Sequence, residues 1–413
     1  MADIRPFAAW RPAPEQTASV ASPPYDVLNS DEAREMAADN PHTFLHVVKA
    51  EIDLAPEEAG NAEAVYARSS ANFQAMAAEG VMLRDETPAI YIYRLTMGDH
   101  HQFGLAVGCS VDEYVDGSIK KHEFTRRDKE DDRARHMEVL GLNAGPVLFT
   151  HRPDTNISKL VADYVSADDP VADFVADDDI GHTIWAVNDP QQIEAFQKAF
   201  KAVDAIYVAD GHHRTASAHR VRDIMQKRND DHTGDEAYNH FLAVIFPADE
   251  LKLMGYHRVI ADLNGLSSDD YMAKVRDIFD VTETDQPEPD GHCQWGMFLD
   301  GQWYNIKARA GSFPADDPVN GLDAAILQSL LLDPVLGIGD PRKDPRIDFV
   351  GGSRGAAELE RRCREDMTVA FAFAPASVDQ IMAVADADEV MPPKSTWFEP
   401  KLRSGLLVRS LTD

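Results

Sequence analysis

The stretch Tyr207-Val208-Ala209-Asp210-Gly211-His212-His213-Arg214 decides how this chain folds. Residues 205–209 are apolar and typical of a short buried strand, and the pair Asp210-Gly211 ends that strand. The pattern from Thr215 to Gln226 then predicts a helix. The sequence therefore predicts a strand, a tight turn and a helix in direct succession.

The start of that helix is a candidate anion site. Free backbone N–H groups at a helix start point outward and carry a partial positive charge. Gly211, His212, His213 and Arg214 lie where a phosphate would be held, and Arg214 adds a planar fork for it. The alternative is purely structural: Asp210 caps the helix, the histidines lie on a surface turn, and Arg214 pairs with a nearby acid.

Length and composition bound the class of protein. At 413 residues the chain exceeds one ordinary domain, so two domains are expected. Its apolar content of 44% is ordinary, and no stretch has the ~18 to 20 apolar residues that span a bilayer. The N-terminus resembles no secretory signal. We expect a soluble cytoplasmic protein without a membrane partner, in which the 3 dispersed cysteines form neither a disulfide framework nor a zinc site.

The charge is strongly acidic, with 40 Lys and Arg against 71 Asp and Glu, a net charge of −31. Such a field repels nucleic acid, because duplex binding depends on Lys and Arg that neutralise phosphates. Nucleic acid is therefore not an expected partner. The basic run from Lys120 to Arg127 stands out against this background. It indicates that an anion or an acidic partner lies nearby.

Helical and strand patterns alternate along the chain, which predicts an α/β fold. Residues 282–291 are acidic and contain prolines, so they are the best linker candidate. A linker there predicts a body over residues 1–281 and a carboxy-terminal part over residues 292–413. The predicted helices are 29–39, opened by a capping box of Asn29 and Glu32, then 57–79, 129–142, 191–202, 321–332 and 356–364. The predicted strands are 89–95, 102–111, 241–246, 347–350 and 369–373, with a hairpin over 295–306 that turns at Asp300-Gly301.

Five motifs occur in a fixed order along nearly the whole chain. They are Ile4-Arg5-Pro6-Phe7, Ser22-Pro23-Pro24-Tyr25-Asp26-Val27, Ile119-Lys120-Lys121-His122-Glu123-Phe124-Thr125, Ala209-Asp210-Gly211-His212-His213-Arg214 and Met391-Pro392-Pro393-Lys394-Ser395-Thr396-Trp397-Phe398. Together they resemble a bacterial family of unknown function that is similar to the free L-serine kinases of the ParB/sulfiredoxin-like superfamily. The resemblance implies a mixed-sheet, ParB/sulfiredoxin-like α/β (α+β) body with a mixed α/β carboxy-terminal part.

The resemblance also implies an activity: transfer of the terminal phosphoryl group of ATP or ADP, with Mg²⁺, to the hydroxyl of free L-serine. The superfamily's phosphate-binding turn resembles Gly211 and Arg214, and His212, His213 and the backbone amides would contact the same phosphates. Phosphoryl transfer requires mainly positioning and charge neutralisation. Asp210 is placed to bind Mg²⁺ or to polarise the nucleophile.

Two carboxylates are candidates for the general base. Glu123 is preferred, since Lys120, Lys121 and Arg126 lie close to it in sequence and would keep it ionised. Asp26 is the rival, although an aspartate after Pro-Pro-Tyr is often only a turn former. The three basic residues are expected to contact phosphate or the substrate carboxylate; the alternative is that they form a solvated strand end.

Other residues receive weaker assignments. Lys394 is a candidate contact to nucleotide or substrate, while Trp397 and Phe398 are expected to pack into the fold. A further group on or just after the helix 129–142 is expected to support the Glu123 segment: Arg133, His136 and Asn143.

Several other functions compete with the kinase. Sulfinic-acid reduction requires a cysteine in the anion-binding turn, where this chain has histidines. A DNA clamp conflicts with the acidic charge. A metal-dependent hydrolase with Asp210, His212 and His213 as ligands is the more serious alternative. A non-catalytic nucleotide-binding regulator stays open as well, and so does a homo-oligomer.

Overall fold

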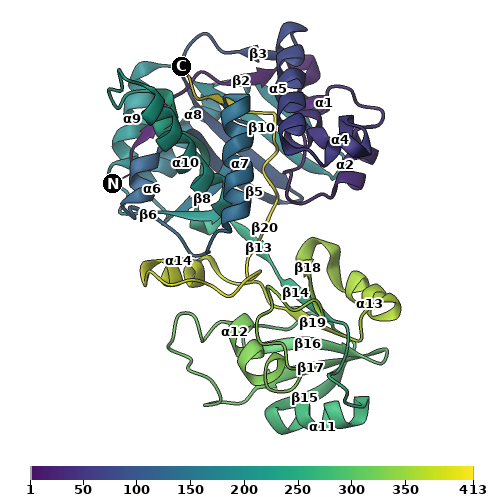
Figure 1. Cartoon of the computed structure of the whole chain (residues 1–413). Coiled ribbons are helices and arrows are strands. Elements are labelled where there is room, and N and C mark those ends of the chain that lie inside the picture. The colour runs from purple at the N-terminus through teal and green to yellow at the C-terminus, as the bar shows by residue number, and fades with distance from the viewer. Residues whose placement is uncertain (1, 413) are drawn as a thin grey trace. The chain divides into compact units, whose positions relative to one another are not determined.

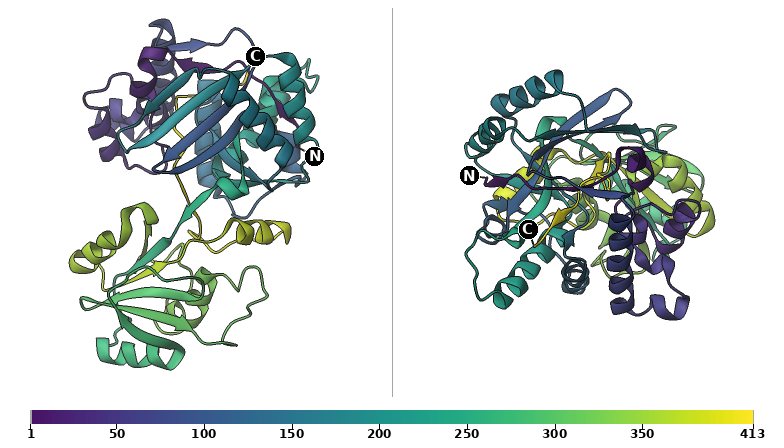
Figure 2. Two further views of the ribbon diagram at one scale, coloured as in Figure 1. Left: turned by 180° about the vertical axis from the view of Figure 1, so that it is seen from behind. Right: turned by 90° about the horizontal axis from the view of Figure 1, so that it is seen from above.

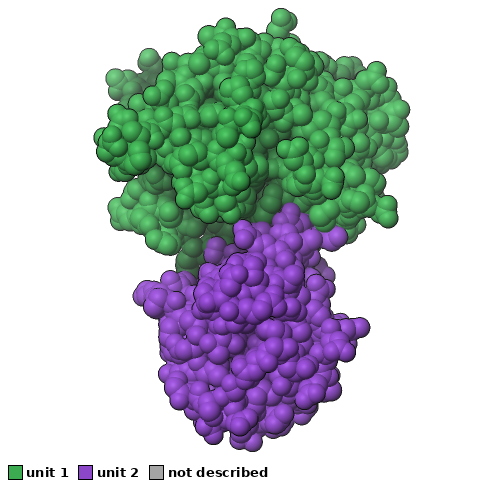
Figure 3. Space-filling model, turned by 90° about the vertical axis from the view of Figure 1, so that its right-hand side faces the viewer, with its two compact units in different colours: residues 1–251, 400–413 green, residues 252–399 purple. Residues whose placement is uncertain are grey.

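The computed structural model describes residues 2–412 and divides the chain into two compact units. The first unit comprises residues 1–251 and 400–413, and the second comprises residues 252–399 (Figures 1 and 3). This division differs from the predicted boundary at 282–291. That segment instead begins within β15 and ends before β16, two strands that flank β17 in one sheet of the second unit. An acidic, proline-containing stretch fits a long connection between strands as well as it fits a linker.

A nine-stranded mixed sheet is the centre of the first unit (Figure 2). Two neighbouring pairs, β6 with β11 and β8 with β12, are parallel, and the other pairs are antiparallel. The order is β6 (Ile119–Lys120), β11 (Ile206–Asp210), β8 (Val147–His151), β12 (His240–Pro247), β5 (His100–Ser110), β4 (Ile90–Met97), β10 (Ile180–Val187) and β9 (Ala172–Val175), with β1 (Ile4–Arg5) beside β5.

Helices and two short strand pairs complete the first unit. The helices are α1 (Thr17–Val20), α2 (Ser30–Ala37), α3 (Leu45–Val48), α4 (Pro56–Ala59), α5 (Ala62–Ala78), α6 (Val111–Val115), α7 (Arg127–Leu140), α8 (Thr155–Ala167), α9 (Pro190–Phe200) and α10 (His212–Arg228). The pairs are β2 (Trp10–Pro12) with β3 (Met82–Arg84), and β7 (Leu142–Asn143) with β21 (Arg409–Ser410). The main core packs α8 and α9 against the sheet through Ile157, Phe196 and Phe200.

Local sequence signals explain where several helices begin and end. The predicted capping box is present: the Asn29 side chain accepts the Glu32 N–H, and the Glu32 carboxylate accepts the Asn29 N–H. The single helix predicted over 57–79 is wrong, because the chain leaves α4 at Gly60 and starts α5 anew at Asn61. The Asn61 side chain accepts the Glu63 N–H, and such a cap favours a new helix start.

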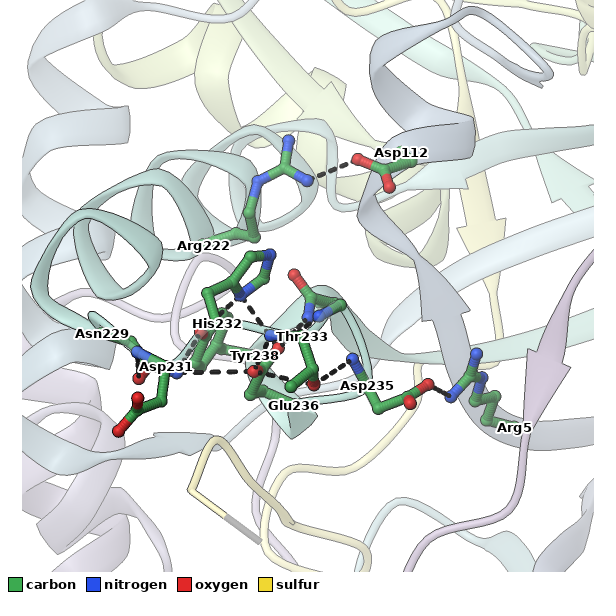
Figure 4. A network of polar contacts seen from close by, with 12 residues as sticks. Arg5, Asp112, Arg222, Asn229, Asp231, His232, Thr233, Asp235, Glu236 and Tyr238 are labelled. Carbon is green, nitrogen blue, oxygen red and sulfur yellow. Dashed lines mark hydrogen bonds and ion pairs between the residues drawn. The ribbon is translucent and has the colours of Figure 1, made fainter.

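The predicted strand, turn and helix around Asp210 are confirmed. Strand β11 ends at Asp210, Gly211 is the N-cap residue, and α10 begins at His212. Both histidines therefore lie in the first helical turn. The C-cap residue of α10, Asn229, belongs to the polar network in Figure 4, where its side chain donates to the Tyr238 hydroxyl at 2.9 Å.

The carboxy-terminal residues 400–413 belong to the first unit. Val408 forms a bridge with Trp10, and β21 pairs with β7. The Arg403 guanidinium binds Asp178 and donates to His182 Nε2 at 3.4 Å. The end of the chain is thus built into the first unit by backbone pairing and by a buried arginine, which is 7% exposed.

The second unit has a six-stranded antiparallel sheet and four α-helices. The sheet order is β15 (Phe279–Thr284), β17 (Gln302–Ala308), β16 (Gln294–Leu299), β19 (Val369–Phe373), β14 (Tyr256–Ile260) and β18 (Ile347–Gly351). A further pair joins β13 (Lys252–Met254) to β20 (Trp397–Glu399). The helices are α11 (Ser268–Ile278), α12 (Asp323–Leu327), α13 (Gly355–Glu365) and α14 (Val378–Asp386).

Most predicted elements of this unit are confirmed. The hairpin of β16 and β17 turns at Asp300 and Gly301, which have φ values of 51° and 84°. The helix predicted over 321–332 begins later, at Asp323, and continues after Leu327 as a π-helical turn. Trp397 and Phe398 pack as expected, since Trp397 lies edge-on to Tyr256 and Phe398 is 2% exposed.

Both units mix helices with sheets, so the predicted mixed α/β class is confirmed. Within residues 2–412, no helix is long and apolar enough to cross a membrane. Cys109, Cys293 and Cys363 are free thiols, as expected, but only Cys109 is fully buried.

Candidate functional site

The turn between β11 and α10 is tightly constrained. Gly211 has φ 96°, a conformation that side chains other than glycine rarely adopt. A Cβ atom at this position would lie 2.8 Å from Val147 Cγ1 and 3.3 Å from Arg214 Cζ. Strand β6 pairs in parallel with β11, with Lys120 opposite Tyr207. The basic segment after β6 therefore runs toward the same turn.

Arg214 is held above this turn by a backbone carbonyl and a carboxylate. Its Nη1 group donates to the Pro146 carbonyl, and its Nη2 atom lies 3.7 Å from Asp26 Oδ2. Its Nε atom is buried and has no hydrogen-bond partner among residues 2–412. Burial alone would lower the pKa of Arg214, but the charges of Asp26 and Asp210 raise it. The guanidinium is thus fixed, charged and still has an unused donor.

Asp210 is paired with a lysine from the far end of the chain. The Lys401 Nζ atom lies 3.1 Å from Asp210 Oδ2. Burial opposes ionisation of Asp210, but Lys401 and Arg214 outweigh it and lower its pKa well below the ordinary range. Sequence reasoning missed Lys401, because no local spacing rule connects residue 401 with residue 210. It favoured Lys394, which instead lies in the second unit, with its Nζ atom 5.6 Å from the Tyr256 ring centroid.

A pair of buried histidines lies beside the turn. The rings of His122 and His212 meet edge to face, with centroids 4.5 Å apart. His212 Nδ1 lies 3.7 Å from Glu123 Oε2. Neither ring nitrogen of His122, and not Nε2 of His212, has a hydrogen-bond partner among the described residues. Burial lowers the pKa of His122 to about 4 and that of His212 well below its ordinary value, so both rings are neutral near pH 7.

The structure brings both candidate bases to the start of α10, but with different neighbours. Glu123 faces a neutral histidine, whereas Asp26 faces the Arg214 guanidinium. The Arg133 guanidinium carbon lies 4.5 Å from the centroid of the Tyr25 ring, next to Asp26. Arg133 therefore contacts the Asp26 segment rather than the Glu123 segment that it was predicted to support.

The two other predicted supporting residues are occupied elsewhere. His136 Nε2 lies 2.9 Å from the Ser69 hydroxyl, and the Asn143 side chain accepts the Leu242 N–H at 3.2 Å. Both contacts are structural. They connect helix α7 and the strand after it to the body of the first unit.

The predicted basic contacts around Glu123 are largely engaged with protein groups. Lys121 donates to the Tyr114 carbonyl at 3.4 Å and lies 4.2 Å from the centroid of that residue's ring. The Arg126 side chain pairs with Asp128 at 2.7 Å, and the Arg126 backbone N–H donates to His213 Nε2 at 3.1 Å. The role of Lys120 stays a prediction.

The donors at this turn fit an anion better than a protein-held metal. The backbone N–H groups at the helix start and the unused Arg214 Nε suit a phosphate. Within residues 2–412, no group of three His, Cys, Asp or Glu side chains is arranged to hold a metal ion. Mg²⁺ in nucleotide sites needs only one or two carboxylates, because phosphates and waters supply the other ligands. The single carboxylate of Asp210 would be enough for such a site.

Residues 4–325 match the family model described as "Protein of unknown function (DUF1015)". This chain belongs to that family. No curated protein matches it. Among solved structures, a free serine kinase in complex with AMP is similar over 75% of this chain and 91% of its own, at 13% identity and a TM-score of 0.37.

Two other solved structures give similar values. A conserved hypothetical protein from Pyrococcus furiosus matches over 74% of this chain and 95% of its own, at 14% identity and a TM-score of 0.34. SbnI from Staphylococcus aureus, truncated at its C-terminus, matches over 73% and 86%, at 11% identity and a TM-score of 0.37.

Proposed function

We propose that the first unit of this DUF1015 protein is a small-molecule kinase. It transfers the terminal phosphoryl group of ATP or ADP to the hydroxyl of free L-serine. The observation that carries the proposal is the meeting of two sequence motifs at one helix start: Asp26 of the Pro-Pro-Tyr-Asp motif lies 3.7 Å from Arg214 of the Gly-His-His-Arg motif. A phosphate clamp and a carboxylate that can accept a proton are thus neighbours.

The phosphate-binding part consists of Gly211, the N–H groups that open α10, and Arg214. Gly211 supplies the positive φ that the turn requires, and Arg214 offers its unused Nε–H to the donor phosphates. Lys401 lies against Asp210 and adds a second positive charge. A bound Mg²⁺ would neutralise phosphate charge, and Asp210 is the residue that would hold it.

The contacts of the two carboxylates favour Asp26 over Glu123 as the general base. The argument for Glu123 depended on basic neighbours, yet Lys121 lies against Tyr114 and Arg126 pairs with Asp128. Asp26 has a fixed guanidinium beside it. In the proposed step the serine oxygen forms a bond to the terminal phosphorus, the bond to the bridging oxygen breaks, and the serine proton moves to Asp26.

A product assay tests the proposal. The full chain is incubated with ATP or ADP, Mg²⁺ and a panel of amino acids, and products are identified by mass. We expect O-phosphoserine from serine only, and loss of that product in Arg214→Ala, whose folding is checked by circular dichroism. Nucleotide binding without any phosphorylated amino acid would instead identify a non-catalytic nucleotide-binding protein. Unchanged kinetics in folded Arg214→Ala would reject the clamp.

A second pair of variants identifies the base. Asn keeps the shape and hydrogen bonding of Asp26 but removes its basicity, so kcat of Asp26→Asn should fall by ~10² to 10⁴ while nucleotide affinity changes little. Glu123→Gln should have the milder effect. The reverse pattern would move the base to Glu123, and equal modest losses would mean that positioning alone carries catalysis.

A further inference from the structure

The second unit contains a buried arginine on the core side of its sheet. Arg258 lies in the middle of β14, and the alternation along this strand places it on the same face as Ile260, a member of the main core of this unit. Only 3% of Arg258 is exposed. Its guanidinium carbon lies 4.3 Å from the centroid of the Phe373 ring and 5.5 Å from that of Phe349.

Among residues 2–412, this arginine has no acidic partner. Its Nη1 group donates to the Tyr256 carbonyl at 3.1 Å and its Nη2 group to the Pro393 carbonyl at 3.3 Å. The ion pairs found within residues 2–412 include none with Arg258. Burial lowers the pKa of Arg258 to about 10. A buried charge without a counter-charge is costly, so a site of this kind favours an anion from outside the chain.

The guanidinium lines a small hollow that offers further donors. A guanidinium has five N–H groups. Two of those of Arg258 donate to the carbonyls of Tyr256 and Pro393. Gln380 also lines the hollow; its Oε1 atom accepts the Ser377 N–H, and its amide NH₂ group is a further donor. Asp323 also lines the hollow, and its carboxylate accepts a hydrogen bond from the Cys293 N–H and lies 3.2 Å from His292 Nδ1.

We propose that this hollow is a binding site for the carboxylate group of a small organic acid. A carboxylate matches the planar Arg258 fork and would supply the missing negative charge. The hollow has room for about 20 Å³, which admits a group about the size of one carboxylate oxygen. The proposal concerns the second unit alone and does not depend on the proposed kinase activity.

An acetate titration of the full chain, followed by NMR, tests the site. The Arg258 Nε–H signal, assigned by its loss in Arg258→Met, and the backbone amide of Ser395, which also lines the hollow, should shift saturably with acetate. In Arg258→Met the dissociation constant of acetate, measured from the Ser395 amide signal, should rise by about 10- to 100-fold. This is the change expected from the loss of one hydrogen bond to a charged group. Arg362→Met is the matched control, because Arg362 is paired with Asp348 and Asp366 and should leave acetate binding unchanged.

Three results would overturn the proposal: no saturable shift of the two signals, an unchanged dissociation constant in Arg258→Met, or tighter binding of inorganic phosphate than of acetate at equal ionic strength. If Arg258→Met does not fold, crystals of the unaltered chain soaked in acetate are the deciding test. Difference density for a planar group beside the guanidinium supports the site, and ordered crystals without that density reject it.

Discussion

His122 should make the first unit less stable in acid, by an amount that follows from its environment. The ring is 2% exposed and its nitrogens have no partners among the described residues. Burial lowers its pKa from 6.5 to about 4. Between these two values the unfolded chain binds a proton that the folded chain does not bind, so the free energy of unfolding decreases as the pH falls. A difference of about 2.5 between the two pKa values corresponds to a loss of about 3 kcal/mol by pH ~4.

The variant His122→Phe isolates this contribution. Phenylalanine preserves a planar ring against His212 but cannot take up a proton. The free energy of unfolding of the variant minus that of the unaltered chain should therefore rise by about 3 kcal/mol as the pH is lowered from ~7 to ~4. Urea unfolding at several pH values measures it, read from the folded histidine Cε1–H signals of the first unit. The same signals give the pKa of His122 directly.

His46→Gln is a control of opposite sign in the same unit. A hydrogen bond to Asp53 raises the pKa of His46, so its stabilising contribution is complete below pH ~6.5 and is lost as the pH rises through the folded value. The reasoning fails if His122 titrates near pH ~6.5, or if the difference between His122→Phe and the unaltered chain does not change with pH.

Two further changes test the turn itself. Gly211→Ala forces a Cβ against Val147 at positive φ and should cost about 1 to 3 kcal/mol or more in urea unfolding, whereas Gly117→Ala, with positive φ but open space, should cost less; equal losses would mean that the crowding is unimportant. Lys401→Met should weaken ATP binding measured by calorimetry and destabilise the fold at pH ~7. Since Lys401 lowers the pKa of Asp210, the loss of unfolding free energy in Lys401→Met should become smaller below pH ~4. A loss that does not depend on pH would exclude the ion pair as its cause.

Local signals in the sequence were sufficient for much of the fold. The apolar run before Asp210 and the helical pattern after it predict β11 and α10, and Asp300-Gly301 predicts the hairpin of β16 and β17. These features depend on residues close together in the chain, such as a glycine that tolerates positive φ. The same reasoning failed over 57–79, because a cap at Asn61 outweighed a continuous helical pattern.

The sequence by itself determined the mixed α/β class and the glycine turn, and it predicts the residues of the proposed anion site. Only the tertiary structure decided which charges meet there. Asp26, Arg214 and Lys401 are far apart in the chain, and no periodicity links them, so their contacts depend on how the sheet and the returning carboxy-terminal segment fold together. The same holds for Arg258, whose missing counter-charge is a property of its buried surroundings and cannot be read from neighbouring residues.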